Sequence, residues 1–260
     1  MKVPTNLILL ATAAATATFP ALGSADSLVS SEVMALLYQD SENAPPPPAP
    51  PTEAESPDRW YAAAALGATF LLDTQIKSND GPKFKFNTGI GLNLGVGYIL
   101  TKSWAIEVRS GILWNEIDQY QGSSQGVTVS GGDGRIYQVP LMFSGIYSIP
   151  LSEKFSVGLK AGVGVQWTNF NVDNIRAVSA AGTDFVSYDN TSASFRWEVG
   201  IQLAHQIAHN IRIGGGFIFS GTSSVDIGSP TINGNTISFV SDDLEPLYNF
   251  SLGFGVNIAF

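Results

Sequence analysis

The chain has 260 residues, of which 44% are hydrophobic and only 13% charged, with 27 glycines, no cysteine and a formal net charge of -9. The absence of cysteine excludes a disulfide-stapled domain, and the charged fraction is well below the about 25% that is typical of soluble domains. The acidic balance and the lack of a basic cluster argue against nucleic acid as a partner, because phosphate binding needs lysine or arginine.

The N-terminal segment has the pattern of a secretory signal. Lys2 supplies a positive charge, Leu7–Phe19 is an apolar run rich in alanine, and small residues follow it. We therefore predict a signal peptide over residues 1–25, cleaved after Gly23 or Ala25. A membrane anchor is the alternative, but the apolar run is short for a helical span.

Residues 26–58 contain a run, Pro45–Pro51, that is nearly all proline. Polyproline is extended and semi-rigid, and it lacks the N–H groups that pair strands. We predict a periplasmic proline-rich arm that acts as a spacer, with a specific protein partner for the proline run as the alternative.

From Trp60 onward, apolar residues alternate with small or polar ones. Between Asn87 and Tyr98 the even positions are mostly apolar, while the odd positions are glycine or asparagine. This period of two predicts β-strands with one apolar face, and no apolar run long enough for a membrane-spanning helix follows the signal segment. The alternation occurs in eight segments: 59–71, 87–98, 104–114, 134–149, 155–167, 192–207, 210–222 and 246–260.

The connections between these segments are alternately short and long. The short ones are 100–103, 150–153 and 208–210, and the long ones are 72–83, 117–133, 170–191 and 223–245. Outer-membrane barrels have short periplasmic turns and long external loops. The second strand face carries glycine, serine, asparagine and glutamine, which suits a narrow polar lumen better than the water-facing side of a soluble sandwich or lipocalin.

We therefore predict an all-β fold, an eight-stranded antiparallel transmembrane up-and-down β-barrel over residues 59–260. It would lie in the outer membrane of a Gram-negative-type bacterium, in contact with outer-membrane lipids, as a monomer. Within it we expect Gly131–Gly134 to form a loop tip or hairpin turn. We expect a β-bulge at Pro140, because proline removes a ladder hydrogen bond.

Several segments resemble the small eight-stranded outer-membrane β-barrel superfamily, with its OmpA, OmpX, OmpW and opacity-protein-like members. They include Gln138–Leu141, Ala161–Gly164 and the last strand, which ends on phenylalanine. The resemblance implies that the last strand is the signal by which the barrel assembly machinery recognises the chain. Its alternating residues are Tyr248, Phe250, Leu252, Phe254, Val256, Ile258 and Phe260.

Ionisable residues on the inward faces form the candidate site. They are Glu107, Arg109, Lys160, Arg196, Glu198 and Arg212. Unpaired charges are costly inside a narrow barrel, so we expect them to pair. Such a network would either plug the lumen or line a narrow hydrophilic pore.

We predict no enzyme, no cofactor and no metal site. The histidines, His205 and His209, are placed at the periplasmic end, whereas barrel enzymes of similar architecture carry Asp/His or His/Ser groups near the outer rim. Three functional hypotheses remain. The first is a structural envelope protein with a charge-plugged lumen, and the second is a narrow porin-like pore for small solutes. The third is an adhesion barrel that binds a host or matrix ligand through the acidic loops 170–191 and 223–245.

Overall fold

The computed structural model describes residues 59–77, 82–124, 126–236 and 242–260. The predicted signal peptide, 1–25, and the predicted proline-rich arm, 26–58, lie outside the described residues. Within these ranges no helix is long and apolar enough to cross a membrane.

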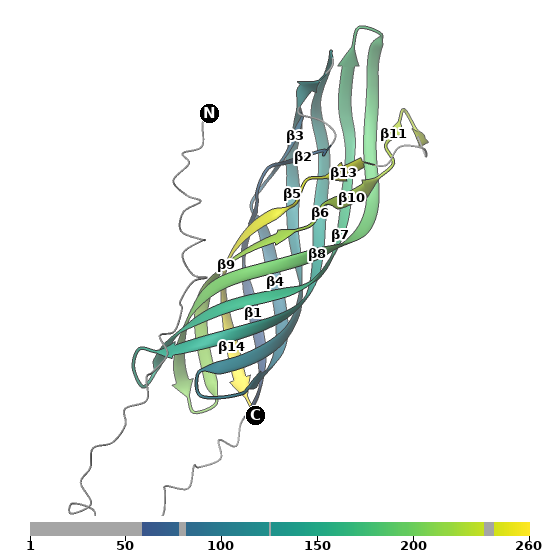
Figure 1. Cartoon of the computed structure of the whole chain (residues 1–260). Helices are drawn as coiled ribbons and strands as arrows, with labels where there is room; N and C mark the ends of the chain where they lie inside the picture. Colours follow the sequence, from purple (N-terminus) through teal and green to yellow (C-terminus); the bar gives the residue numbers. More distant parts are fainter. Residues whose placement is uncertain (1–58, 78–81, 125, 237–241) are drawn as a thin grey trace, which may run out of the picture. The chain divides into compact units, whose positions relative to one another are not determined.

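Eight strands close a ring in the order β1-β4-β5-β6-β7-β8-β9-β14, and β14 pairs with β1 (Figure 1). Every neighbouring pair in the ring is antiparallel. The predicted eight-stranded antiparallel up-and-down barrel is thereby confirmed. The ring strands are β1 (Trp60–Leu71), β4 (Gly89–Ile99), β5 (Trp104–Ser124), β6 (Val127–Pro150), β7 (Phe155–Ser179), β8 (Gly182–Ala208), β9 (Ile211–Thr222) and β14 (Tyr248–Ala259).

Six short strands lie in the connections at one end of the barrel (Figure 1). They are β2 (Thr74–Gln75), β3 (Lys83–Phe86), β10 (Val225–Gly228), β11 (Thr231–Ile232), β12 (Asn235–Thr236) and β13 (Asp242–Leu244). The β2–β3 hairpin extends the sheet beside β5, the β11–β12 hairpin extends it beside β8, and β10 pairs with β13. We call this the outer end, and the opposite end, which has the short turns, the inner end. Short turns identify the periplasmic side of a membrane barrel.

Two of the segments predicted as long loops are strands, so those predictions were wrong. β5 runs to Ser124 and β6 begins at Val127, while β7 runs to Ser179 and β8 begins at Gly182, so most of 117–133 and 170–191 belongs to two long pairs of strands. The polar backbone groups of these segments pair across the hairpins, and pairing between β6 and β7 continues as far as Thr128 and Val178. The composition suggested loops, but backbone pairing satisfies the same polar groups.

The Gly131–Gly134 segment and Pro140 also differ from expectation. The glycines lie inside β6 rather than at a loop tip, and the positive φ of Gly131 and Gly132, 84° and 96°, introduces a local irregularity that the strand tolerates. Pro140 creates no bulge, because the register between β5 and β6 is the same on both sides of it and its pairing with Gln166 of β7 is regular. A proline lacks one N–H, and the ladder loses that bond without gaining a residue.

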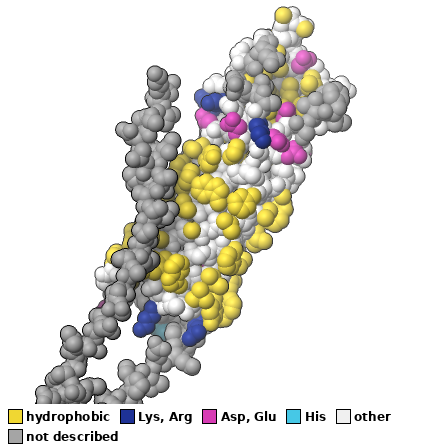
Figure 2. All heavy atoms as spheres, in the orientation of Figure 1, with side chains coloured by type: hydrophobic (Ala, Val, Ile, Leu, Met, Phe, Trp, Pro, Cys, Tyr) yellow, Lys and Arg dark blue, Asp and Glu magenta, His cyan; other side chains and the backbone are white. Residues whose placement is uncertain are grey.

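The two faces of the ring differ in the way the alternation predicts. Outward side chains such as Leu94 and Phe254 are 57% and 60% exposed, whereas the inward Gln138 and Gln166 are 1% and 0% exposed. Figure 2 shows the outward apolar side chains as a band between charged ends. This apolar belt comprises the segments 60–70, 90–99, 104–114, 137–149, 155–167, 195–207, 211–219 and 248–260.

Aromatic pairs mark both limits of the belt. Trp60 lies against Tyr98, with ring centroids 4.9 Å apart, near the inner end. Trp114 and Tyr137 stack at 6.2 Å near the outer end. Aromatic girdles of this kind border the lipid-facing surface of membrane barrels, where the amphipathic rings sit at headgroup level.

Candidate functional site: the charged lumen

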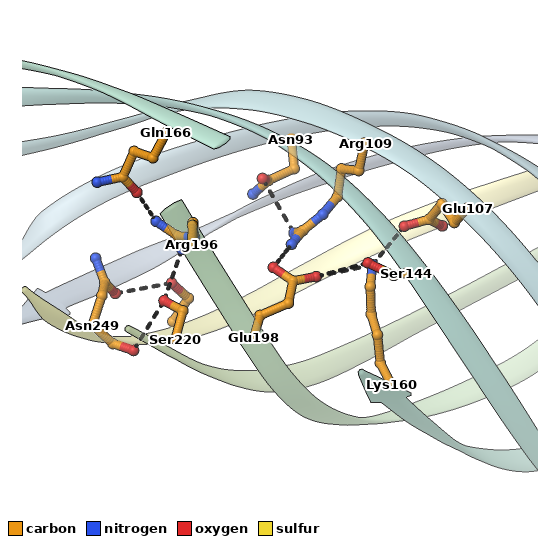
Figure 3. Close-up of polar contacts among 11 residues, drawn as sticks. Asn93, Glu107, Arg109, Ser144, Lys160, Gln166, Arg196, Glu198, Ser220 and Asn249 are labelled. Carbon is orange, nitrogen blue, oxygen red and sulfur yellow. Dashed lines mark hydrogen bonds and ion pairs between the residues drawn. The ribbon is translucent and has the colours of Figure 1, made fainter. Parts of the chain in front are cut away.

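Four of the predicted lumen charges form a chain of ion pairs inside the belt. Lys160 Nζ lies 2.5 Å from Glu107 Oε1 and 3.8 Å from Glu198 Oε1, and the second carboxylate oxygen of Glu198 pairs with the Arg109 guanidinium. Figure 3 shows the Glu198 carboxylate facing Arg109 on one side and Lys160 on the other. Glu198 is 1% exposed and Arg109 and Lys160 are each 9% exposed, so the ion-pair cluster is buried.

Neutral side chains complete the cluster. The Tyr61 hydroxyl donates to Glu107 Oε2 at 3.2 Å, the Ser144 hydroxyl donates to Glu198 at 3.1 Å, and Arg109 donates to Asn93 Oδ1 at 3.2 Å. Only the charges were singled out from the sequence. The partners share their inward parity, which is the signal that would have identified them.

Glycine at position 97 makes room for one of these partners. Gly97 lies opposite Tyr61 in the β1–β4 ladder, and a Cβ at this position would lie 2.1 Å from the Tyr61 ring carbon Cζ. Any larger residue would therefore displace the phenol that donates to Glu107.

Arg196 is buried nearby but contacts neutral groups. It donates to the side-chain oxygen of Gln166 and, at 2.7 Å, to the Ser220 hydroxyl, which donates in turn to the Asn249 carbonyl at 3.5 Å. Arg196 is 3% exposed. With it, the buried set contains three basic and two acidic side chains, so a positive charge is in excess.

Arg212, the sixth predicted residue, is not part of the three ion pairs that join Glu107, Arg109, Lys160 and Glu198. It lies one residue after the start of β9, at the inner end, and its side chain is exposed. The structure therefore brings Glu107, Arg109, Lys160 and Glu198 together, places Arg196 beside them, and leaves Arg212 at the mouth of the barrel.

A cavity of about 130 Å³ adjoins the ion-pair cluster, and most of its lining comes from β1, β4, β8, β9 and β14. Small residues line this wall, among them Ala63, Gly95, Gly216 and Gly253, together with Asn93. Larger buried side chains, among them Met142, Gln166 and Arg196, lie on β6, β7 and β8. The lumen is therefore asymmetric, with open space on the glycine-rich side and side-chain packing on the other.

An apolar cluster fills the barrel on the outer side of the charges. Phe84 of β3 stacks on Tyr120 of β5 at 4.0 Å and meets the Phe170 ring edge-on at 5.1 Å. The members of this outer core are Leu71, Ile76, Phe84, Ile117, Tyr120, Ile136, Phe170, Val172, Ile175, Tyr188, Val225, Ile227, Leu244 and Leu247. This cluster was not predicted from the sequence, although Val225 and Ile227 already show a period of two.

One buried polar contact lies in the outer core, beyond the apolar belt. The Tyr188 hydroxyl donates to Asp242 Oδ2 at 2.8 Å. Burial, reinforced by the Asp242 carboxylate, raises the pKa of Tyr188 far above its usual range. Burial, with a smaller contribution from Asp242, also raises the pKa of Tyr120 to about 12.

Both histidines lie near the inner end of the barrel. His205 stacks on Phe155, with ring centroids 4.3 Å apart, near the inner end, and His209 lies in the turn after β8. In the part of the chain that the structure describes, no three acidic or histidine side chains gather in a way that would hold a metal ion.

The strand predicted as the assembly signal is β14, between β1 and β9. Its even-numbered side chains face outward, and Leu252, Phe254 and the terminal Phe260 are 60%, 60% and 64% exposed. These apolar side chains are thus part of the belt.

Comparison with solved structures finds small barrels of similar architecture. Neisserial surface protein A is 13% identical, with 77% of this chain and 97% of that chain covered and a TM-score of 0.45. OprG from Pseudomonas aeruginosa is 14% identical, with coverages of 77% and 96% and a TM-score of 0.41. A major outer membrane protein from Thermus thermophilus is 14% identical, with coverages of 76% and 99% and a TM-score of 0.45.

Comparison with curated protein sequences found no match. The family model described as the outer membrane protein beta-barrel domain matches residues 47–260, which is most of the chain. Together with the closed ring and the apolar belt, this match places the protein in the cell outer membrane. The chain belongs to the outer membrane protein beta-barrel domain family.

Proposed function

We propose that this protein is a structural component of the outer membrane, a barrel whose lumen is plugged rather than open. The observation that carries the proposal is the buried ion-pair cluster of Glu107, Arg109, Lys160 and Glu198, which links β5, β7 and β8 across the interior. The outer core lies beyond it and adds a second barrier of apolar side chains.

The physical cost of opening supports the proposal. On the side of the lumen that the ion-pair cluster fills, a permeating ion would have to separate buried charges that lie 2.5 Å apart, such as Lys160 and Glu107. Coulomb attraction between such charges is much stronger there than in bulk water, and removing one partner leaves the other buried and unpaired. The same ion would also have to pass the outer core, where it finds few polar groups to replace its hydration.

Single-channel conductance in a planar bilayer tests the proposal. We expect no discrete openings from the wild-type protein once a heat-dependent shift in gel mobility has shown that it is folded. Glu107→Ala should also be silent, because the outer core remains in place. Frequent wild-type openings that change with Glu107→Ala would refute the plug and favour a narrow pore.

The narrow pore remains the second candidate, and the cavity of about 130 Å³ beside the cluster favours it. The cavity leaves room for water along the glycine-rich wall. A pore through this wall would lose conductance when a side chain fills it, for instance in Gly95→Val. A plugged barrel would show no conductance before or after that change.

An adhesive role is the third candidate. The β7–β8 hairpin projects beyond the outer core and exposes Phe185 and Val178, at 54% and 36%. Removing residues 223–245 would also remove Val225, Ile227 and Leu244 from the outer core, so loop deletion is a poor test. Phe185→Ser with Val178→Ser leaves the core intact and should abolish cell or matrix binding if the hairpin carries it.

We further infer that the protein is not an enzyme, acts as a monomer, and has outer-membrane lipids and the barrel assembly machinery as its partners. The first inference is supported by the position of His205 and His209 at the inner end. The last is supported by β14, whose outward side chains end on Phe260. Phe260→Ala should lower the yield of assembled barrel in cells, while refolding of the purified chain in detergent stays nearly unchanged.

A further inference from the structure

The inner mouth of the barrel contains a second cavity, of about 120 Å³. Three basic side chains line it: Lys102 from the β4–β5 turn, Lys154 from the β6–β7 turn, and Arg212 from β9. Glu153 contributes a carboxylate, so basic side chains outnumber acidic ones in this lining. Figure 2 shows lysine and arginine side chains at this end, below the apolar belt.

Serine hydroxyls add hydrogen-bond donors to the same cavity. Ser148, Ser152 and Ser156 all line it. The Ser152 oxygen already accepts from the backbone N–H groups of Lys154 and Phe155, at 3.4 and 3.2 Å. Its own hydroxyl hydrogen is therefore available to donate to another group.

We propose that this inner-mouth pocket binds the phosphate group of a soluble periplasmic molecule. Phosphate matches the lining because it carries negative charge and presents several acceptor oxygens to cationic and hydroxyl donors. A water molecule needs about 10–15 Å³ of cavity space of this kind, so a pocket of about 120 Å³ has room for several waters and therefore for a phosphate group.

The neighbouring space accounts for the rest of the ligand. Ala204 lines both the inner-mouth pocket and the cavity beside the ion-pair cluster, so the two adjoin. The cavity beside the ion-pair cluster is lined by small residues and by polar side chains such as Gln202 and Asn257. A compact polar substituent on the phosphate fits there, or it extends out of the mouth into the periplasm.

The inward direction of the side chains that line the pocket favours a soluble ligand over a lipid headgroup. Ser148, Ser156 and Arg212 have the parity of the inward side chains on β6, β7 and β9, whereas lipid surrounds the outward face. Lys102 and Lys154 are exposed in their turns and accessible from the periplasm. Because the pocket uses only residues of the inner mouth, the proposal does not rest on the closure of the lumen.

Isothermal titration calorimetry tests the pocket. Inorganic phosphate or glycerol 3-phosphate is titrated into the full-length folded protein in zwitterionic micelles at low ionic strength. The test variant is Lys154→Gln with Arg212→Gln. The matched control, Lys83→Gln with Arg176→Gln, removes the same charge from exposed positions at the outer end. We expect saturable wild-type binding, a Kd at least tenfold higher in the inner variant, and a Kd within twofold of wild type in the outer variant.

Two results would overturn the proposal. The first is that the wild-type protein shows no saturable binding of phosphate, or that both variants lose affinity equally. Either result would mean that the protein attracts phosphate only through its overall charge and not through the pocket. The second comes from vesicles of phosphatidylcholine with and without phosphatidylglycerol. If the inner residues affect only the preference for phosphatidylglycerol and not the binding of soluble phosphate, the pocket belongs to a lipid headgroup. Higher salt should raise the Kd for the soluble phosphates and weaken binding to vesicles, because salt screens exposed charges.

Discussion

Replacing Glu198 with alanine tests the energetics of the ion-pair cluster most directly. The change removes the acceptor of Arg109, of Ser144 and of the longer Lys160 contact, while Lys160 keeps Glu107 at 2.5 Å. The cost therefore falls mainly on Arg109, which retains Asn93 as a hydrogen-bond partner. Breaking a buried pair costs about 3–5 kcal/mol, and we expect about 3 kcal/mol, the lower end, because half the cluster stays paired.

The assay is reversible urea unfolding in phosphatidylcholine vesicles, followed by tryptophan fluorescence. Glu116→Ala is the control, since Glu116 is exposed at the outer end and its loss should change the free energy of unfolding by less than about 0.5 kcal/mol. Arg196→Gln reduces the excess positive charge and should cost less than Glu198→Ala. Equal losses for Glu198→Ala and Glu116→Ala, or a larger loss for Arg196→Gln, would refute the assignment of Glu198 as the centre of the cluster.

Three further predictions concern the wall and the outer core. Leu94→Arg, on the lipid face, should cost about 2–4 kcal/mol in the same unfolding assay, and a loss near zero would contradict the facing of β4. Gly97→Ala should destabilise the barrel more than Gly95→Ala, because only the former pushes against the Tyr61 ring; the two unfolding midpoints measure this. The folded state holds the Tyr188 proton to higher pH than an unfolded chain does, so the free energy of unfolding should fall as pH rises above about 10. Tyr188→Phe should flatten this fall between about pH 9 and 11, and an unchanged slope would show that the phenol does not contribute.

The alternation of apolar and polar residues was sufficient to predict the eight strands of the barrel, because this alternation depends only on which side of a strand each residue faces. It also identified Glu107, Arg109, Lys160 and Glu198 as inward, but it carried no information on distance between strands. Whether Arg196 meets a carboxylate or Gln166 depends on register and side-chain length, which only the structure supplies.

The outer end was predicted least well, for two reasons. Glycine and aspartate are depleted in strands in general, so the segments 117–133 and 170–191 had the composition of loops. Their strands form because each hairpin continues a ladder begun inside the belt, and because inward side chains such as Phe170 and Tyr188 pack into the outer core. Both causes are tertiary, and a local sequence pattern does not contain them.

The seam between β1 and β14 joins the two ends of the barrel sequence, from Tyr61 opposite Ala259 to Leu71 opposite Asn249. Until β14 is in place, β1 and β9 both have unpaired edges, and such edges invite pairing with other chains. Contacts this distant in sequence also form slowly, because a long loop has to close before they stabilise anything. A chain truncated before Tyr248 would lack β14, so the edges of β1 and β9 would stay unpaired and open to other chains. The pairing of β14 with both strands therefore completes the fold and removes these edges in the same step.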